Sequence, residues 1–245
     1  MFAEDSAFFA ETDPEATDII SSIAKIAESH GLTINGDKAK IMTTDGSEAK
    51  VDLEGVQLEQ VREFKYLVSL LEDKKIAATA EVNSRIGKDS TAFISLKWSV
   101  WKKNSISLTT KMRLLRTLVL PILLYGSETW TLLKLDSNKL ETFQMRCLRQ
   151  ILGISILSRI RNEHIRDSCG HQPTVEEQIR IRRLRWFGHV CRMDTTRPPR
   201  NLMWRKRPTQ WKVQRAAPEK TWIKHIEADL KILWCSKSSR MEACR

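Results

Sequence analysis

Long apolar runs are absent from this chain of 245 residues. No segment approaches the ~18 consecutive apolar residues that a membrane-spanning helix needs. The N-terminus also lacks the basic segment followed by an apolar one that marks a secretory signal peptide. We therefore expect an intracellular protein, nuclear or cytoplasmic, that is neither secreted nor membrane-bound.

Cysteine is scarce, and the motifs of several enzyme classes are missing. The five cysteines all lie in the C-terminal half: Cys147, Cys169, Cys191, Cys235 and Cys244. An odd number of cysteines without a signal peptide argues against a disulfide framework and for reduced thiols. The sequence contains neither a glycine-rich phosphate loop nor a nucleophile in a recognisable elbow.

The spacing of the candidate ligands disfavours a zinc site. One residue separates Cys169 from His171, and one separates His189 from Cys191, whereas the paired ligands of zinc sites usually have two to four residues between them. On a helix, His189 and Cys191 would also project about 200° apart. We expect packed or partly exposed side chains here, with zinc as the less favoured alternative.

Charge is distributed very unevenly along the chain. Residues 1–100 hold 11 Lys and Arg against 18 Asp and Glu, a net of −7, whereas residues 101–245 hold 30 against 12, a net of +18. All eight tryptophans lie at or after Trp98. Cationic charge interleaved with aromatic rings suits phosphate neutralisation and base stacking. The pattern favours nucleic-acid contact over the alternative of a merely solvated basic surface.

The first hundred residues predict one helix and several short strands. Asp13 can cap a helix that has one apolar face and ends at Gly31. Residues 32–41 predict short strands around a polar turn, and residues 51–58 alternate as a hairpin would. Residues 64–67 predict a further strand.

Beyond about residue 76 the spacing of apolar residues becomes helical. Helices are predicted from Ile86 towards Trp101, from Leu108 to Leu124 with a bend at Pro121, from Asp136 or Ser137 to Gly153, after a capping box of Thr174 with Glu177, and from Thr221 to Leu233. The Pro- and Arg-rich residues 195–218 predict a loop or linker.

Two expectations concern individual side chains of this helical half. In the helix after Thr174 we expect four apolar residues to face inward and the arginines to cover the remainder: Ile179, Leu184, Phe187 and Val190, against Arg180, Arg182, Arg183 and Arg185. Trp98, Trp101 and Trp130 are expected in the core or at helix interfaces. For Trp186, a core position and a base-stacking position are more evenly balanced, because arginines flank it on both sides.

Six short segments form an ordered series along the chain. They are Phe2-Ala3-Glu4-Asp5, residues 31–35 followed by Lys38 and Lys40, residues 64–67, residues 120–130, residues 183–190 and residues 220–223. In this order and at these spacings, they resemble the C-terminal part of a reverse transcriptase encoded by a non-LTR (LINE-type) retrotransposon. The resemblance covers nearly the whole chain and rests on the series rather than on any single motif.

The resemblance implies an α+β fold in four parts. Residues 1–75 would be a partial reverse-transcriptase palm, with a helix, short antiparallel strands and a hairpin. Residues 76–157 would be a helical, thumb-like region and residues 158–194 a basic helical extension. Residues 195–245 would be a Pro/Arg-rich linker with a short terminal helix.

The same resemblance implies roles for several residues of the first part. Glu4 and Asp5 match the carboxylates that bind catalytic Mg²⁺ in the intact family, with Glu4 in place of an aspartate. Lys38 or Lys40 would lie close to the active site. Residues 64–69 would form the hairpin that supports the primer end, where the family usually has glycine and this chain has Val68.

Two-metal nucleotidyl transfer needs several converging carboxylates, and this chain offers one pair. The family's other essential aspartate, and the fingers that bind template and nucleotide, would fall before Met1. The longer Glu4 side chain also displaces its carboxylate, and a misplacement of ~1 Å can cost about a hundredfold in rate. We therefore expect Glu4 and Asp5 to be remnants that hold no Mg²⁺ productively.

Two classes of function are consistent with the sequence. The first is a fragment of a retrotransposon RNA-directed DNA polymerase, inactive by itself, that still binds RNA or DNA as a hybrid or a single strand. The second is a non-enzymatic module, derived from a retroelement, that binds a protein partner. The candidate nucleic-acid contacts are Lys38, Lys40, Lys65, Tyr66, Arg180, Arg182, Arg183, Arg185, Trp186 and Lys206, with Arg197 and Arg200 as additional candidates.

Overall fold

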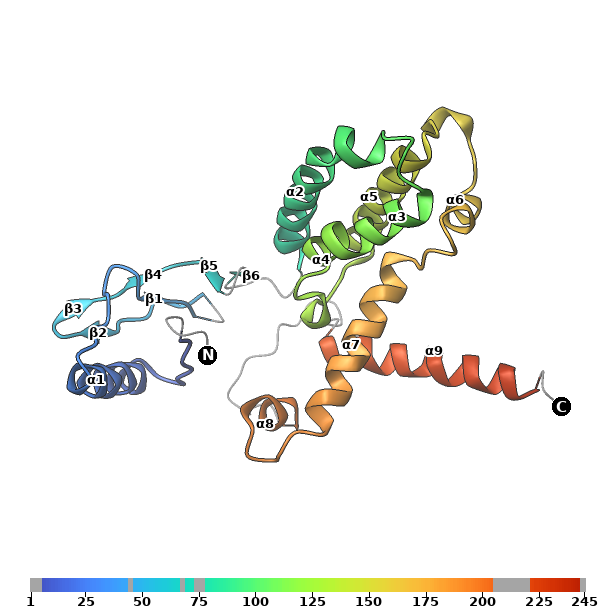
Figure 1. Ribbon diagram of the computed structural model, residues 1–245. Coiled ribbons are helices and arrows are strands. Elements are labelled where there is room, and N and C mark those ends of the chain that lie inside the picture. The colour runs from blue at the N-terminus through green and yellow to red at the C-terminus, as the bar shows by residue number, and fades with distance from the viewer. Residues whose placement is uncertain (1–5, 44–45, 67–68, 73–77, 205–220, 243–245) are drawn as a thin grey trace. The chain divides into compact units, whose positions relative to one another are not determined.

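The structure is a computed structural model that describes residues 6–43, 46–66, 69–72, 78–204 and 221–242 (Figure 1). The chain divides into two compact units, unit 1 of residues 1–76 and unit 2 of residues 77–245. Unit 1 combines a helix with short strands, whereas unit 2 is helical. The predicted α+β fold with a helical C-terminal region is therefore confirmed. Within the described residues, no helix is long and apolar enough to cross a membrane.

Unit 1 opens with helix α1 (Asp13–Ser29), as predicted. Its cap is one residue earlier than expected, because the Thr12 hydroxyl accepts a hydrogen bond from the backbone N–H of Glu15 at 3.4 Å. The Asp13 carboxylate instead accepts one from the backbone N–H of Lys50 at 3.0 Å, which ties α1 to the segment before the central hairpin. No residue of α1 is buried.

The described strands of unit 1 form three separate pairs. β1 (Lys40–Ile41) pairs in parallel with β4 (Glu59–Gln60), and β2 (Asp52–Leu53) pairs antiparallel with β3 (Val56–Gln57). Glu54 and Gly55, with φ of 54° and 83°, make the two-residue turn of the predicted hairpin. The strand expected at Leu32 and Ile34 is wrong, because residues 32–35 form none and lead into a turn closed on the Asn35 carbonyl.

The third pair confirms the strand predicted from Phe64. β5 (Glu63–Tyr66) and β6 (Ser69–Glu72) form an antiparallel hairpin in which Tyr66 lies opposite Ser69. Leu67 and Val68, at the turn of this hairpin, lie outside the described residues.

Unit 2 is organised around α2 (Thr79–Ser95) and α5 (Lys134–Leu152), which run in the same direction (Figure 1). The Thr79 hydroxyl donates a hydrogen bond to the Asp136 carboxylate at 2.7 Å, and the Lys139 ammonium donates one to the Asn83 side chain at 3.1 Å. Five shorter elements connect the two helices: the π-helical turn η1 (Lys97–Trp101), α3 (Leu108–Leu114), the π-helical turn η2 (Leu115–Val119), α4 (Leu120–Leu123) and the 3₁₀ turn η3 (Ser127–Thr129).

Pro121 explains why the helix predicted over residues 108–124 is not uniform. Proline has no N–H, and in a regular helix its ring clashes with the carbonyl four residues earlier. The chain widens into η2 just before the proline, so that Pro121 occupies the first turn of α4, where an N–H has no partner in any case.

The remaining helices are η4 (Ile156–Ser158), α6 (Asn162–Ser168), α7 (Val175–Cys191), α8 (Pro198–Trp204) and α9 (Trp222–Glu242). α7 begins at the predicted capping box, in which the Thr174 hydroxyl accepts from the Glu177 N–H and the Glu177 carboxylate accepts from the Thr174 N–H. Two predictions here are wrong. The segment expected to be a loop contains α8, and α9 runs beyond Leu233 to Glu242.

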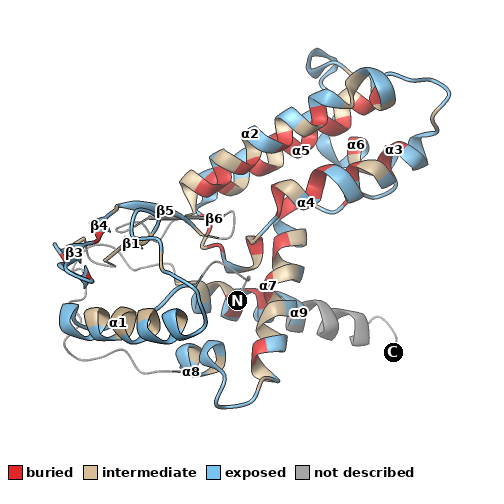
Figure 2. Ribbon diagram, turned by 60° about the vertical axis from the view of Figure 1, so that its left-hand side comes forward, coloured by how far each residue is buried: buried red, intermediate tan, exposed pale blue. Residues whose placement is uncertain are grey.

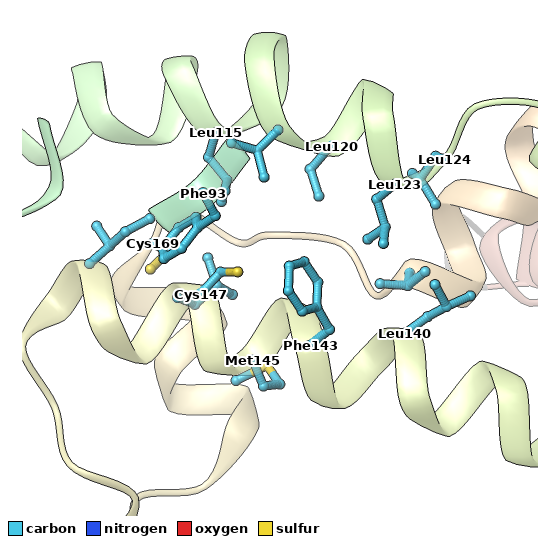
Figure 3. Packing of buried hydrophobic residues seen from close by; sticks show 14 of the residues in the cluster. Phe93, Leu115, Leu120, Leu123, Leu124, Leu140, Phe143, Met145, Cys147 and Cys169 are labelled. Atoms are coloured by element: carbon cyan, nitrogen blue, oxygen red, sulfur yellow. The ribbon is translucent and has the colours of Figure 1, made fainter. Parts of the chain in front are cut away.

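One continuous hydrophobic core lies between the helices of unit 2 (Figure 2). All five apolar residues predicted to face inward from α5 are buried: Leu140, Phe143, Cys147, Leu148 and Ile151. Phe93, Cys147 and Cys169 meet at one end of this core, and Leu123, Leu124 and Leu140 meet at the other (Figure 3). α5 ends at Gly153, whose φ of 70° is the left-handed conformation that glycine adopts without strain.

Candidate nucleic-acid interface

Three arginines of α7 anchor this helix to its neighbours. The Arg183 guanidinium donates to the Asp229 carboxylate of α9 at 2.6 Å, and Arg180 contacts the same carboxylate at 3.3 Å. Arg182 donates to the backbone carbonyl of Leu124 at 3.2 Å. The prediction that Arg183 lies on the outer surface is wrong: only 5% of it is exposed, because Asp229 supplies a charged partner inside the interface.

Trp222 strengthens the same attachment from the start of α9. Its indole N–H donates to the backbone carbonyl of Glu128 at 2.7 Å, and its ring lies edge-on to Phe187, with centroids 6.5 Å apart. Ile226, one turn further along α9, is buried. These contacts fix which face of α7 is turned away from the core.

The outward face of α7 is basic. Arg185, His189 and Arg192 are exposed and follow one another at spacings of four and three residues, which places them in one row along the helix. Trp186 is half-buried beside them, its ring 5.6 Å from that of His189. A β-carbon at Gly188 would lie 3.3 Å from the Arg192 guanidinium, so the glycine leaves room for that side chain.

α8 contacts α7 and adds further arginines beyond this row. Arg200 donates to the backbone carbonyl of Met193 and lies 5.9 Å from the centre of the Trp204 ring, close enough for a cation–π contact. An open hollow of about 720 Å³ is lined by Thr195, Arg200, Asn201 and Trp204. We call the set Arg185, Trp186, His189, Arg192, Arg197, Arg200 and Trp204 the α7–α8 surface.

Asp194 is the acidic residue at the turn between α7 and α8. Its carboxylate accepts hydrogen bonds from the backbone N–H and the hydroxyl of Thr196, at 2.8 and 2.7 Å. These bonds, with a smaller contribution from Arg200, hold the pKa of Asp194 below its ordinary value. Asp194 therefore stays ionised and shapes the turn into α8.

The candidate residues of unit 1 lie in and around its strands. Lys38 is exposed in the turn before β1, whereas the Lys40 ammonium pairs with the Glu59 carboxylate of β4 at 2.5 Å. Lys65 and Tyr66 are neighbours in β5 and therefore point to opposite faces of the hairpin. Glu4, Asp5 and Lys206 lie outside the described residues.

No group of three or more metal-type ligands occurs in the part of the chain that the structure describes. The Cys169 thiol is buried, which raises its pKa, and His171 contacts the Asp167 carboxylate at 2.8 Å. Glu4 and Asp5, which the resemblance matches to Mg²⁺ ligands, belong to the residues that the structure does not describe.

Comparison with known proteins relates the chain to retrotransposon polymerases. An uncharacterised transposon-derived protein of Caenorhabditis elegans is 26% identical over 225 residues, which are 86% of this chain and 77% of that protein. A probable RNA-directed DNA polymerase from transposon BS of Drosophila melanogaster is 32% identical over 132 residues, and the polymerase from mobile element jockey is 26% identical over 140 residues. The chain is a distant homologue of non-LTR retrotransposon reverse transcriptases.

The similarity to the two polymerases covers 54% and 56% of this chain but only 14% and 15% of their own lengths. No protein-family model matches the chain, and no solved structure matches it. The candidate interface therefore rests on the contacts of the chain itself.

The tryptophans differ in exposure more than the sequence predicts. Trp101 and Trp130 are buried, as predicted, but Trp98 is 75% exposed, so its expected place in the core is wrong. Arg192 and Trp204 were not expected either. The helical spacing of Arg185, His189 and Arg192 could have predicted that Arg192 lies on the same face. The position of Trp204 on a helix could not be predicted, because Pro198 and Pro199 indicated a loop.

Proposed function

We propose that this chain, derived from the C-terminal part of a retrotransposon reverse transcriptase, binds RNA or DNA through the α7–α8 surface. The observation that carries the proposal is the outward row of Arg185, His189 and Arg192 on a helix whose other arginines are held by internal contacts. Some arginines of α7 thus anchor the helix to its neighbours, and others are exposed and available to a ligand.

The dimensions of the row suit a nucleic-acid backbone. Arg185 and Arg192 are seven residues apart, which is about 10 Å along a helix. One strand of a duplex advances about 3.4 Å per nucleotide, so the two guanidiniums span roughly three nucleotides. Arg197 and Arg200 add cationic charge on α8.

The aromatic residues of this surface add a second kind of contact. Trp204 is exposed at the edge of the hollow on α8, and Trp186 is half-buried on α7. Bases stack on such rings without regard to sequence. We therefore expect binding that tolerates many sequences and depends on phosphate charge.

We assign binding, and not nucleotidyl transfer, to these 245 residues taken by themselves. Glu4 and Asp5 are the only acids that match the family's metal ligands, and one pair is too few to hold two ions. Primer extension with Mg²⁺ or Mn²⁺ should give no template-dependent incorporation. Incorporation that is lost on changing Asp5→Ala would overturn this part of the proposal.

The binding surface is tested by removing two of its charges. Arg185→Gln with Arg192→Gln should weaken binding of a labelled RNA/DNA hybrid or single strand, measured by fluorescence anisotropy at fixed salt. The matched control is Lys25→Gln with Lys50→Gln, which removes two exposed charges from unit 1. Equal affinities for the two double variants would contradict the assignment to α7–α8. Salt-insensitive binding to a protein, with none to nucleic acid, would favour the interaction module instead.

A further inference from the structure

Two long segments of unit 2 contain no acidic residue. Residues 90–127 hold six Lys and Arg, residues 142–162 hold four Arg, and neither segment has an Asp or Glu. Every residue of both segments is described. A surface built from them has a cationic charge that no acid of its own offsets, which favours a polyanionic ligand.

The two segments meet at one end of unit 2. α2 and α5 run in parallel, so the turn that follows α2 and the loop that follows α5 lie at the same end (Figures 1 and 2). Leu96 and Val100 from the first segment and Ile154 from the second pack against the same core. We call residues 94–105 and 153–161 together the distal surface.

The π-helical turn η1 determines which tryptophan of the distal surface is exposed. Trp101 closes the turn inward: its indole N–H donates to the Phe93 carbonyl at 2.7 Å, and its ring stacks on Phe93 with centroids 5.0 Å apart. Trp98, three residues earlier, is 75% exposed, and Ile94 is exposed one turn before it. Single wide turns of this kind often occur at functional sites.

One lysine contacts the exposed indole ring, and further cationic side chains belong to the distal surface. The Lys97 ammonium lies 5.1 Å from the centre of the Trp98 ring. Lys102, Lys103, Arg159 and Arg161 are exposed and form no ion pair within the described residues. Arg149 holds the loop after α5 in place, because its guanidinium donates to the Ile160 carbonyl and the Asn162 side chain, both at 2.9 Å.

We propose that the distal surface binds single-stranded nucleic acid, with an unpaired base stacked on Trp98 and backbone phosphates on the lysines and arginines of the same surface. An exposed ring among cations can stack on the face of an unpaired base, whereas paired bases in a duplex present only their edges. This inference rests on the proposed function, because it takes unit 2 to bind nucleic acid. It adds a second binding site and names single strands as the ligand of that site.

The test compares Trp98→Ala with wild type on two probes, a short labelled single-stranded RNA and a double-stranded RNA hairpin. Losing one stacked base should weaken single-strand binding by roughly 5- to 150-fold and leave duplex binding nearly unchanged. Trp98→Phe should retain part of the affinity. Leu135→Ala, which removes an exposed apolar side chain from the other end of α5, is the matched control and should change neither affinity.

A second pair of variants tests the cations independently of the ring. Lys102→Glu with Lys103→Glu should weaken single-strand binding more than Lys134→Glu, which alters an exposed lysine at the start of α5. Single-strand affinity that survives both Trp98→Ala and the lysine changes would overturn the distal surface and leave the α7–α8 proposal standing. If wild-type protein binds neither probe, the proposed function itself fails, and the distal surface fails with it.

Discussion

The two units of this chain differ in how their described residues are packed. Unit 1 has a cluster of three buried apolar residues, Val51, Leu53 and Leu58, whereas 21 buried apolar residues form the core of unit 2. The strands of unit 1 are paired two by two, an arrangement that is marginally stable in water without further packing. The large core of unit 2 holds its charged helix faces in fixed positions. The smaller core of unit 1 fixes its surface side chains less firmly.

This difference predicts two unfolding transitions in urea, with unit 1 unfolding at the lower concentration. Far-ultraviolet circular dichroism follows both units. The tryptophans report on unit 2 alone, because all eight lie at or after Trp98. A single transition seen identically by both probes would show that the two units unfold together.

The largest effect is expected from a fully buried residue of the unit 2 core. Leu140 is 0% exposed, and Leu140→Ala should lower the free energy of unfolding of unit 2 by about 3–5 kcal/mol, through lost burial and the cavity left behind. Leu135, in the same helix, is 71% exposed, so Leu135→Ala should have little effect. Urea denaturation followed by tryptophan fluorescence measures both, and equal effects would mean that the core is wrongly located.

The next effect separates two arginines of α7 that are two residues apart. Arg183→Ala removes the shorter of the two arginine contacts to buried Asp229, keeps the longer one to Arg180, and should destabilise unit 2 by about 3 kcal/mol. Arg185→Ala should leave the unfolding curve unchanged and weaken nucleic-acid binding. If Arg185→Ala destabilised the fold while Arg183→Ala weakened only binding, the division of α7 into inner and outer arginines would be reversed.

Buried Asp89 should make the stability of unit 2 depend on pH. Neither of its carboxylate oxygens has a hydrogen-bond partner within the described residues, and burial raises its pKa from 3.8 to about 7. The Cys147 thiol, whose pKa burial raises to about 12, lies near enough for the Asp89 charge to add to that shift.

The sign of this effect follows from proton binding. Between about pH 4 and pH 7 the unfolded chain releases the Asp89 proton while the folded chain keeps it, so stability falls as pH rises. Asp89→Asn should remove most of this dependence of the unfolding free energy on pH and should stabilise unit 2 at pH 7.5 by on the order of 2 kcal/mol. The gain is limited because the buried amide also lacks hydrogen-bond partners. Urea denaturation at pH 4.5 and pH 7.5 measures the free energy of unfolding of both proteins. If it changes between the two pH values as much in the variant as in wild type, Asp89 does not cause the pH dependence.

The smallest effect belongs to unit 1. Thr12→Ala removes the cap of α1 and should destabilise unit 1 by about 0.5–1 kcal/mol, towards the lower end because the capping hydrogen bond is long at 3.4 Å. The tryptophan signal of unit 2 should not move. Ser22→Ala, at an exposed position within α1, is the control and should change little. A shift of the tryptophan transition by Thr12→Ala would mean that the two units unfold together.

The sequence predicted features that depend on local chemistry. The capping box at Thr174 and Glu177, the turn at Glu54 and Gly55 and the helix end at Gly153 are each determined by neighbouring residues, and all three are confirmed. The inward face of α5 followed from helical spacing. These features depend little on distant parts of the chain.

Features that depend on distant partners could not be predicted. Arg183 is buried because Asp229, 46 residues later, supplies a carboxylate, and no local pattern indicates that pairing. Trp98 is exposed because η1 adds a wide turn that brings Trp101 onto Phe93 instead. The division between anchoring and available side chains, on which the candidate interface depends, became visible only in three dimensions.

We propose that unit 2 binds nucleic acid mainly through phosphate contacts, and the salt dependence of binding is the sharpest test of this. For a labelled single-stranded RNA, the logarithm of the observed binding constant Kobs should fall linearly with the logarithm of the salt concentration. The slope should be roughly −2 to −4 if about three to five cations contact phosphate. Arg185→Gln with Arg192→Gln should make the slope shallower by about one to two. No binding at low salt, or a slope that the double variant leaves unchanged, would contradict the account.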